Sequence, residues 1–312
     1  MSRLSTRLKP GISRAHFLKL VGAAGALAAA PNLPSFAAER PLVMRPIPNS
    51  KDGEQLPVIG LGTAQDFGAR REIEDKTQVL KSLLDGGGKI IDTAANYAGG
   101  SSEELIGEIL GEHNLRSKAF IATKFGERGR ENGIESMERS FKSLRTDLID
   151  LMFVHNMIDV DTHLPSLRDY KDQGRIRYFG VTSTGRNQDN LTRWMDQLDF
   201  VEFAYAVDFR DAEQRLLPMA ADKGVAVLIA LPLGRDRPLS AMRGKEVPEW
   251  AKVELGCHTY AQLLLKFVVS HPNVTAAIPG TNNPKHMVEN LDAGRGPMAD
   301  AKQRERIAAL WD

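Results

Sequence analysis

The chain has 312 residues, with 41 lysines and arginines against 40 aspartates and glutamates, and its formal net charge is +1. Residues 1–37 hold five of the basic residues and no acid, so the remainder has 36 basic against 40 acidic side chains and a formal charge of −4. This balance argues against a nucleic-acid-binding protein. The single cysteine, Cys257, excludes an intrachain disulfide framework and a cysteine-based zinc site.

The first 37 residues have the pattern of a signal peptide. A basic stretch precedes an alanine-rich apolar segment, residues 20–30, which is shorter than the roughly 20 residues that span a bilayer. The small residues before position 38 predict cleavage after Ala37 and export, with a periplasmic location. Residues 13–19 resemble a twin-arginine export motif, but Ala15 stands where the second arginine belongs. The expected partner is the export machinery; the alternatives are a membrane-associating N-terminal helix, or a cytoplasmic protein if the leader does not function.

The rest of the chain alternates apolar runs with amphipathic segments. Asp52-Gly53 predicts the turn of a β-hairpin ahead of the first run. Eight runs are each expected to form a strand: 57–62, 89–94, 119–125, 148–155, 176–183, 200–206, 225–232 and 274–280. Helical spacing of apolar residues occurs at 71–87, 101–113, 134–146 and 259–272.

This alternation predicts an α/β fold, a single (β/α)8 TIM barrel over residues 38–312 with an N-terminal hairpin. Strands that are apolar on both faces suit a parallel sheet covered by helices, and eight such units suit a closed barrel of about 250 residues. A doubly wound sheet is the competing fold, although the first strand–helix junction, 60–70, lacks the full G-x-G-x-x-G spacing. Residues 234–256 are rich in glycine, proline and charge, and we expect them to form a functional loop.

Polar side chains follow several of the predicted strands at their carboxyl ends. Because the active site of a (β/α)8 barrel lies at that end, we expect these side chains to meet at one mouth. In chain order they are Asp92, Tyr97, Lys124, His155, Thr182 and Ser183.

This set is suited to the reduction of a carbonyl group. Tyrosine, with a pKa of about 10, is a weak acid, and the ammonium of Lys124 would lower the pKa of Tyr97. Asp92 would hold Lys124 and offset the cost of burying it. His155 would hydrogen-bond the carbonyl oxygen as negative charge develops there. A hydrolase or isomerase barrel is disfavoured, because the sequence shows no clustered metal-type histidines and no second mouth carboxylate near Asp92.

From about residue 42 to its end the chain resembles the aldo-keto reductase family. The motifs that carry the resemblance are GLGTA, IDTAANYAGGSSEELIGEIL, IATKFG, DLMFVHN, YFGVTS, PLG and IPGTNNPKHMVENL. The resemblance implies a catalytic tetrad of Asp92, Tyr97, Lys124 and His155, and a small aldehyde or ketone as substrate. It implies NADP(H) as the preferred cofactor, with NAD(H) possible, and no metal. The alternative is a regulatory or sensor subunit of the same fold that binds a nicotinamide cofactor without turning it over.

The resemblance also implies which residues bind the cofactor. Glu202 stands where the family usually has glutamine, and Ala230 where many members have a tyrosine that stacks on the nicotinamide. His286 stands at the place of an arginine that holds the 2′-phosphate, with Lys285 beside it. The full set is Thr63, Asp92, Thr182, Ser183, Glu202, Pro232, Leu233, Gly234, Gly280, Thr281, Lys285, His286, Glu289 and Asn290.

Overall fold

The computed structural model describes residues 40–64, 67–68 and 71–312, which belong to one compact unit. The expected signal peptide, residues 1–37, lies outside the described residues. Within the described ranges, no helix is both long enough and apolar enough to cross a bilayer.

Eight parallel strands form the barrel, in sequential order. They are β3 (Leu61–Gly62), β4 (Ile90–Asp92), β5 (Phe120–Phe125), β6 (Ile149–Val154), β7 (Ile176–Ser183), β8 (Phe200–Ala204), β9 (Ala226–Ala230) and β10 (Ala276–Ala277). The last strand meets the first through parallel bridges that pair Ile59 with Ala277 and Gly62 with Gly280. The predicted barrel is therefore confirmed, and the doubly wound sheet is wrong.

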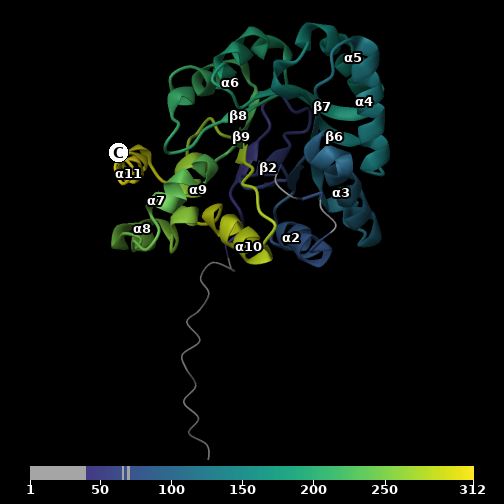
Figure 1. The fold of residues 1–312 in the computed structure, drawn as a ribbon. Helices are drawn as coiled ribbons and strands as arrows, with labels where there is room; N and C mark the ends of the chain where they lie inside the picture. The colour runs from purple at the N-terminus through teal and green to yellow at the C-terminus, as the bar shows by residue number, and fades with distance from the viewer. Residues whose placement is uncertain (1–39, 65–66, 69–70) are drawn as a thin grey trace, which may run out of the picture. The chain divides into compact units, whose positions relative to one another are not determined.

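Helices surround these strands (Figure 1). They are α2 (Ile73–Asp85), α3 (Ser101–Glu112), α4 (Arg130–Ser143), α5 (Val160–Asp172), α6 (Leu216–Lys223), α7 (Arg237–Ala241), α8 (Glu249–Leu255), α9 (Tyr260–Val269), α10 (Pro284–Ala293) and α11 (Ala301–Ala308). The four predicted helices correspond to α2, α3, α4 and α9. The buried apolar faces of the helices and the outward faces of the strands form one continuous hydrophobic core.

Two segments differ from their prediction. In the first run, 57–62, the regular barrel strand is only Leu61–Gly62, Ile59 adds a single bridge, and Pro57 belongs to a strand of the hairpin. Gly60 lies so close to β4 that an added Cβ would stand 2.7 Å from the Cβ of Ile90, which explains the glycine in this junction. The expected loop 234–256 contains the short helices α7 and α8.

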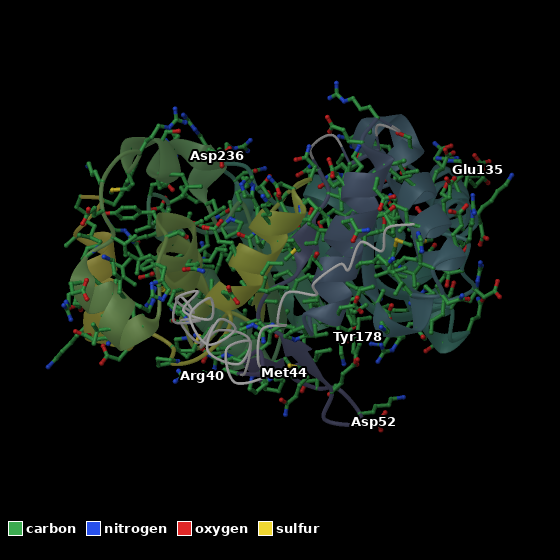
Figure 2. All side chains as sticks on the ribbon, turned by 90° about the horizontal axis from the view of Figure 1, so that it is seen from below. Arg40, Met44, Asp52, Glu135, Tyr178 and Asp236 are labelled. Carbon is green, nitrogen blue, oxygen red and sulfur yellow. The ribbon has the colours of Figure 1, made fainter. Side chains whose placement is uncertain are left out.

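The predicted hairpin is present and closes the lower end of the barrel. Strand β1 (Met44–Pro46) pairs antiparallel with β2 (Gln55–Pro57). Ile47 and Leu56 are buried in the same cluster as the apolar side chains of the barrel interior. Figure 2, seen from below, shows Asp52 at the tip of this hairpin.

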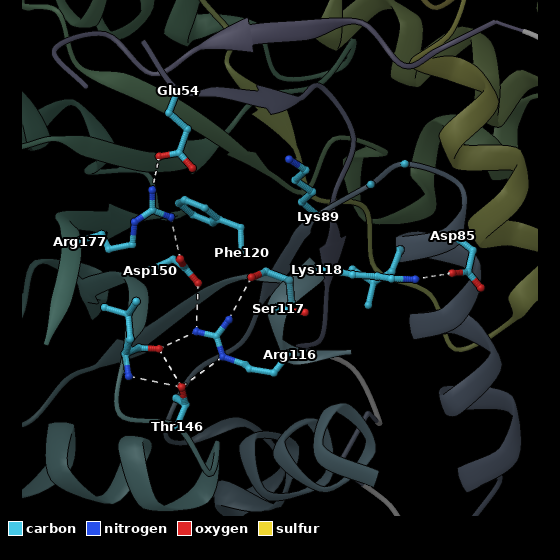
Figure 3. Close-up of a pocket in the computed structure, with 15 residues that line it drawn as sticks. Glu54, Asp85, Lys89, Arg116, Ser117, Lys118, Phe120, Thr146, Asp150 and Arg177 are labelled. Carbon is cyan, nitrogen blue, oxygen red and sulfur yellow. Dashed lines mark hydrogen bonds and ion pairs between the residues drawn. The ribbon is translucent and has the colours of Figure 1, made fainter. Parts of the chain in front are cut away.

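A polar network joins the hairpin to the strand bases beside a pocket of about 740 Å³ (Figure 3). Asp150 at the base of β6 accepts hydrogen bonds from Arg177 at 2.8 Å, from Arg116 at 3.3 Å and from the backbone N–H of Ile121 at 2.9 Å. Arg177 also forms an ion pair with Glu54 of the hairpin. These contacts fix the hairpin at the end of the barrel opposite the predicted mouth.

Candidate active site

The polar residues of the mouth continue the inward faces of the strands. Side chains of a strand alternate between its two faces, so every second residue points into the barrel. In β5, Phe120 and Ala122 belong to the interior apolar cluster, and Lys124 is the next residue on that face. In β4, Asp92 follows the interior residue Ile90 in the same way. The sequence therefore places an apolar layer below a charged one.

Two further strands add to this upper layer. His155 follows the interior residue Phe153 and opens the short 3-10 helix η3 (His155–Met157). Glu202 follows the interior residue Phe200 in β8. Tyr97 enters from the 3-10 helix η1 (Tyr97–Gly100), which ends in a left-handed turn.

Lys124 is the centre of this layer and is only 1% exposed. Its ammonium donates a short hydrogen bond to Asp92 Oδ1 and another to the backbone oxygen of Thr93 at 3.0 Å. It also lies 3.4 Å from Glu202 Oε2. The predicted pairing of Lys124 with Asp92 is present, and a second carboxylate joins it.

Glu202 corrects one expectation. The sequence indicated no second carboxylate near Asp92, yet Glu202 is 3% exposed and in contact with the same ammonium. The sequence pattern could have placed Glu202 inside the barrel, because it is the one acid in the apolar run FVEFA and shares the inward face of Phe200. What sequence could not reveal is that β8 and β5 face each other across the interior.

The three charges shift one another's protonation. Burial would lower the pKa of Lys124, but the negative charges of Asp92 and Glu202 outweigh it and raise that pKa above its ordinary value. Burial raises the pKa of Glu202 to about 8, and the neighbouring charge of Asp92 adds to this. Burial also raises the pKa of Asp92, and Lys124 opposes that rise. Lys124 therefore stays charged, while the two carboxyls compete for ionisation.

Tyr97 lies over this cluster and beside the histidine. The Lys124 ammonium is 5.3 Å from the centre of the Tyr97 ring, and the rings of Tyr97 and His155 meet edge to face at 6.0 Å between centroids. Burial raises the pKa of Tyr97 to about 12, while the charge of Lys124 lowers it. The expected effect of Lys124 is present, but burial outweighs it.

His155 is neutral at physiological pH. Burial lowers its pKa to about 4, and the nearby charge of Lys124 lowers it further. A neutral imidazole can donate one N–H hydrogen bond to an oxygen at the mouth, but it holds no spare proton to transfer. Tyr97, which keeps its proton, and the neutral His155 can therefore each offer a hydrogen-bond donor at the mouth.

A second hollow lies beyond the ends of β9 and β10. It has a volume of about 670 Å³, and its lining includes several of the residues predicted to bind the cofactor. Its lining consists of Leu233, Asp236, Leu239, Ala261, Gly280, Thr281, Asn282, His286, Glu289 and Asn290. Six of these were predicted; Asp236, Leu239, Ala261 and Asn282 were not. Lys285 is exposed on α10 and does not line the pocket.

Three donors near the start of α10 are already used within the loop: the Thr281 hydroxyl, which donates to the backbone oxygen of Asn283 at 3.4 Å, and the backbone N–H groups of Asn283 and Lys285. The hydroxyl of Thr281 accepts from the backbone N–H of Asn283 at 3.1 Å, and the side chain of Asn283 caps the helix by accepting from the N–H of Lys285 at 2.9 Å. His286 is exposed and lines the pocket. It is therefore the side chain there best placed to meet an anion.

Several other predicted residues stabilise the mouth from within. Thr63 is buried and its hydroxyl donates to the backbone oxygen of Asp92 at 2.9 Å. Thr182 is buried and accepts from the backbone N–H of Asn156 at 3.2 Å. Ser183 and Pro232 are also buried, and neither lines the 670 Å³ pocket. The hydrogen bonds of Thr63 and Thr182 position Asp92 and the turn after β6.

The turn after β9 is conformationally strained and arginine-rich. Leu231, Arg235 and Asp236 have φ values of 54°, 53° and 63°, in the left-handed region that non-glycine residues avoid. Gly234 shares this conformation, with a φ of 61°. Beside the turn, a pocket of about 150 Å³ is lined in part by the arginines Arg186, Arg235 and Arg237. Arg237 forms an ion pair at 2.6 Å with Asp208, which lines the same pocket, so the pocket carries charges of both signs.

The described residues contain no group of three or more His, Cys, Asp or Glu side chains arranged to hold a metal ion. Fold and site together define a (β/α)8 barrel with a buried Lys–carboxylate cluster under a tyrosine. The profile of the Aldo/keto reductase family matches residues 58–312, and the chain belongs to that family.

Known relatives share much of the chain at low identity. Aldo-keto reductase YhdN of Bacillus subtilis is 30% identical over 187 residues, which cover 55% of this chain and 56% of that protein, so the chain spans about half of its length. Methylglyoxal reductase YeaE of Escherichia coli is 29% identical over 250 residues, covering 75% and 84% of the two chains. An aldo-keto reductase from Klebsiella pneumoniae, solved with NADPH, has the same fold, with a TM-score of 0.74, 24% identity, and coverage of 86% and 96%.

Proposed function

We propose that this protein is an NADPH-dependent aldo-keto reductase that reduces small aldehydes or ketones, with Tyr97 as proton donor. The observation that carries the proposal is the position of Tyr97, whose ring centre lies 5.3 Å from the buried ammonium of Lys124 and whose ring meets that of His155 edge to face. Relatives such as YeaE, named a methylglyoxal reductase, support a small carbonyl compound as the substrate class.

The four residues of the tetrad have distinct roles in this reaction. With a pKa of about 12, Tyr97 keeps its proton until a carbonyl oxygen becomes basic during reduction. Lys124 then stabilises the phenolate that remains, and Asp92 holds Lys124 charged and in place. The neutral His155 donates its N–H to the same oxygen.

The cofactor fits the chemistry of the surrounding side chains. A nicotinamide dinucleotide carries two or three phosphate groups, and the arginines Arg186, Arg235 and Arg237 line one pocket while His286 lines the next. We assign Arg186 and Arg235 to the pyrophosphate, since Arg237 is paired with Asp208, and His286 to the 2′-phosphate, with Glu289 and Asn290 on the adenine side. When bound, NADPH supplies the hydride. NADP(H) is preferred over NAD(H) in this proposal, and the NADPH complex of the Klebsiella pneumoniae protein motivates it.

The test is steady-state oxidation of NADPH by the purified protein with a reactive aromatic aldehyde. Repeated turnover, absent when the aldehyde is left out, is the expected result. A protein that binds NADPH, as seen by quenching of its intrinsic fluorescence, yet completes no turnover is a sensor of the same fold and contradicts the proposed reaction.

For residues 1–37 we propose an export leader, on the basis of their charge and their apolar segment. The mature protein should then begin at Ala38 and fractionate with the periplasm. Replacing Ala15→Arg restores the arginine pair and should increase the exported fraction. Recovery of intact Met1 in the main pool, found by N-terminal sequencing, would contradict this proposal.

A further inference from the structure

Lys124 is paired with two carboxylates, Asp92 and Glu202. The inference drawn from this pairing rests on the proposed function. Asp92 Oδ2 and Glu202 Oε2 are both fully buried, and neither accepts a well-formed hydrogen bond, although Glu202 Oε2 lies 3.4 Å from the Lys124 ammonium. Two carboxylates face one ammonium in a site closed to water. Because one ammonium cannot neutralise two buried carboxylates, the cluster holds one more proton than a simple ion pair would.

The extra proton belongs to Glu202 rather than to Asp92. Asp92 makes the short hydrogen bond with Lys124, whereas Glu202 approaches the ammonium only to 3.4 Å. The strands on either side of β8 add no charge, because Glu202 is in register with Thr182 of β7 and Leu228 of β9. The titratable groups around Glu202 are therefore Asp92, Lys124 and Tyr97, with His155 beyond Lys124.

Ionisation of Glu202 acts on Tyr97 through Lys124. While Glu202 is neutral, the ammonium is neutralised by Asp92 alone, and its field favours the phenolate of Tyr97. A negative charge on Glu202 has the opposite effect and raises the pKa of Tyr97. Tyr97 is then a weaker acid, and a proton is transferred less readily to the substrate.

We propose that Glu202 is a positioning residue that controls Lys124: its protonated carboxyl leaves Lys124 free to act on Tyr97, and its ionised carboxylate weakens that action. The carboxylate thereby gives the reductase a pH-dependent loss of activity that glutamine at this position would not produce. Neither the substrate nor the cofactor has to contact Glu202 for this effect.

The direct test compares the pH dependence of kcat in wild type and Glu202→Gln at saturating NADPH. With a pKa of about 8 for Glu202, wild-type kcat should fall about tenfold between pH 7 and pH 9, and the variant should lose less than twofold. Glu103→Gln is the matched control, since Glu103 is equally buried but lies on α3, bonded to Thr123 outside the barrel interior. That variant should keep the wild-type profile.

A second readout does not depend on turnover. A carboxyl whose folded pKa is raised binds its proton more tightly in the folded state, so its stabilising contribution is complete below its ordinary pKa and is lost as pH rises to about 8. The unfolding equilibrium constant of wild type should therefore rise more steeply between pH 5 and pH 8 than that of Glu202→Gln, by up to about tenfold per pH unit.

The two readouts separate this inference from the reaction itself. If neither wild type nor the variants turn over, but the pH dependence of stability changes in Glu202→Gln, the proposed reductase activity is wrong while the protonation of Glu202 in the folded protein is supported. If wild type turns over and Glu202→Gln retains both the loss of kcat near pH 8 and the wild-type stability slope, the role assigned to Glu202 is wrong.

Discussion

The barrel has a charged cluster at each end, and the two are built differently. At the bottom, Asp150 is 7% exposed on its side chain and accepts from two arginines and a backbone N–H, so its charge is fully matched. At the mouth, Asp92 and Glu202 share one ammonium, and each has a buried oxygen that accepts no well-formed hydrogen bond.

The difference in hydrogen bonding indicates that the lower cluster contributes to stability and the cluster at the mouth to the reaction. A buried carboxylate with complete hydrogen bonding keeps its charge and holds its neighbours in place. One with incomplete hydrogen bonding has a shifted protonation equilibrium, which is what proton transfer requires. In (β/α)8 barrels the bottom contributes to stability and the mouth to catalysis. Substitutions at the two ends should therefore change different properties.

The largest effect is expected for Lys124→Met. It leaves two buried carboxylates without their cation and removes the charge that stabilises the Tyr97 phenolate. Turnover should fall by ~10²–10⁴-fold, the range of general acid catalysis. Steady-state kinetics measure this, and a circular dichroism spectrum checks folding. Asp92→Asn, which keeps Lys124, should cost less; equal losses would contradict the separate roles of the two residues.

A different outcome is expected at the bottom for Asp150→Asn. The substitution removes the charge that Arg116 and Arg177 share, so the free energy of unfolding should drop by roughly 1.5–3 kcal/mol. Denaturant titration measures the loss. Turnover of the folded fraction should stay within twofold of wild type. Glu54→Gln, whose side chain is more exposed, should destabilise less. A large drop in turnover without a loss of stability would break the comparison between the ends.

The smallest effect concerns cofactor choice. His286→Arg places a planar, charged donor pair in the pocket and should increase the preference for NADP(H) over NAD(H) by about fivefold, equivalent to about 1 kcal/mol. Fluorescence titration of both cofactors gives the ratio. Lys285→Ala is the matched control, because Lys285 does not line the pocket and should shift the ratio less. If Lys285→Ala changed the cofactor preference more than His286→Arg, the 2′-phosphate would instead bind at the exposed face of α10.

Local sequence patterns predicted the barrel and most of its mouth. The apolar runs located the strands within a few residues, and the polar residue after each run located Asp92, Lys124 and His155. This worked because strand ends, inward faces and the common direction of parallel strands are all set by short-range geometry. Tyr97 was predicted at the mouth because it lies five residues after Asp92, at the end of β4.

Properties that depend on contacts across the barrel were not predicted. The approach of Glu202 to Lys124 joins β8 to β5, which are not neighbours in the sheet. The pKa of Tyr97 depends on how deeply the ring is buried, and burial outweighs the lysine that the sequence identified. The helices α7 and α8 lie in a segment whose glycine, proline and charge content indicated a loop.

Whether Tyr97 is the acid that protonates the substrate is measured by kcat for Tyr97→Phe. The ring and its packing against His155 remain, and only the hydroxyl is lost. We expect a loss of ~10²–10⁴-fold in aldehyde reduction, with NADPH affinity and unfolding free energy close to wild type. A variant that keeps the wild-type kcat would contradict the role of Tyr97.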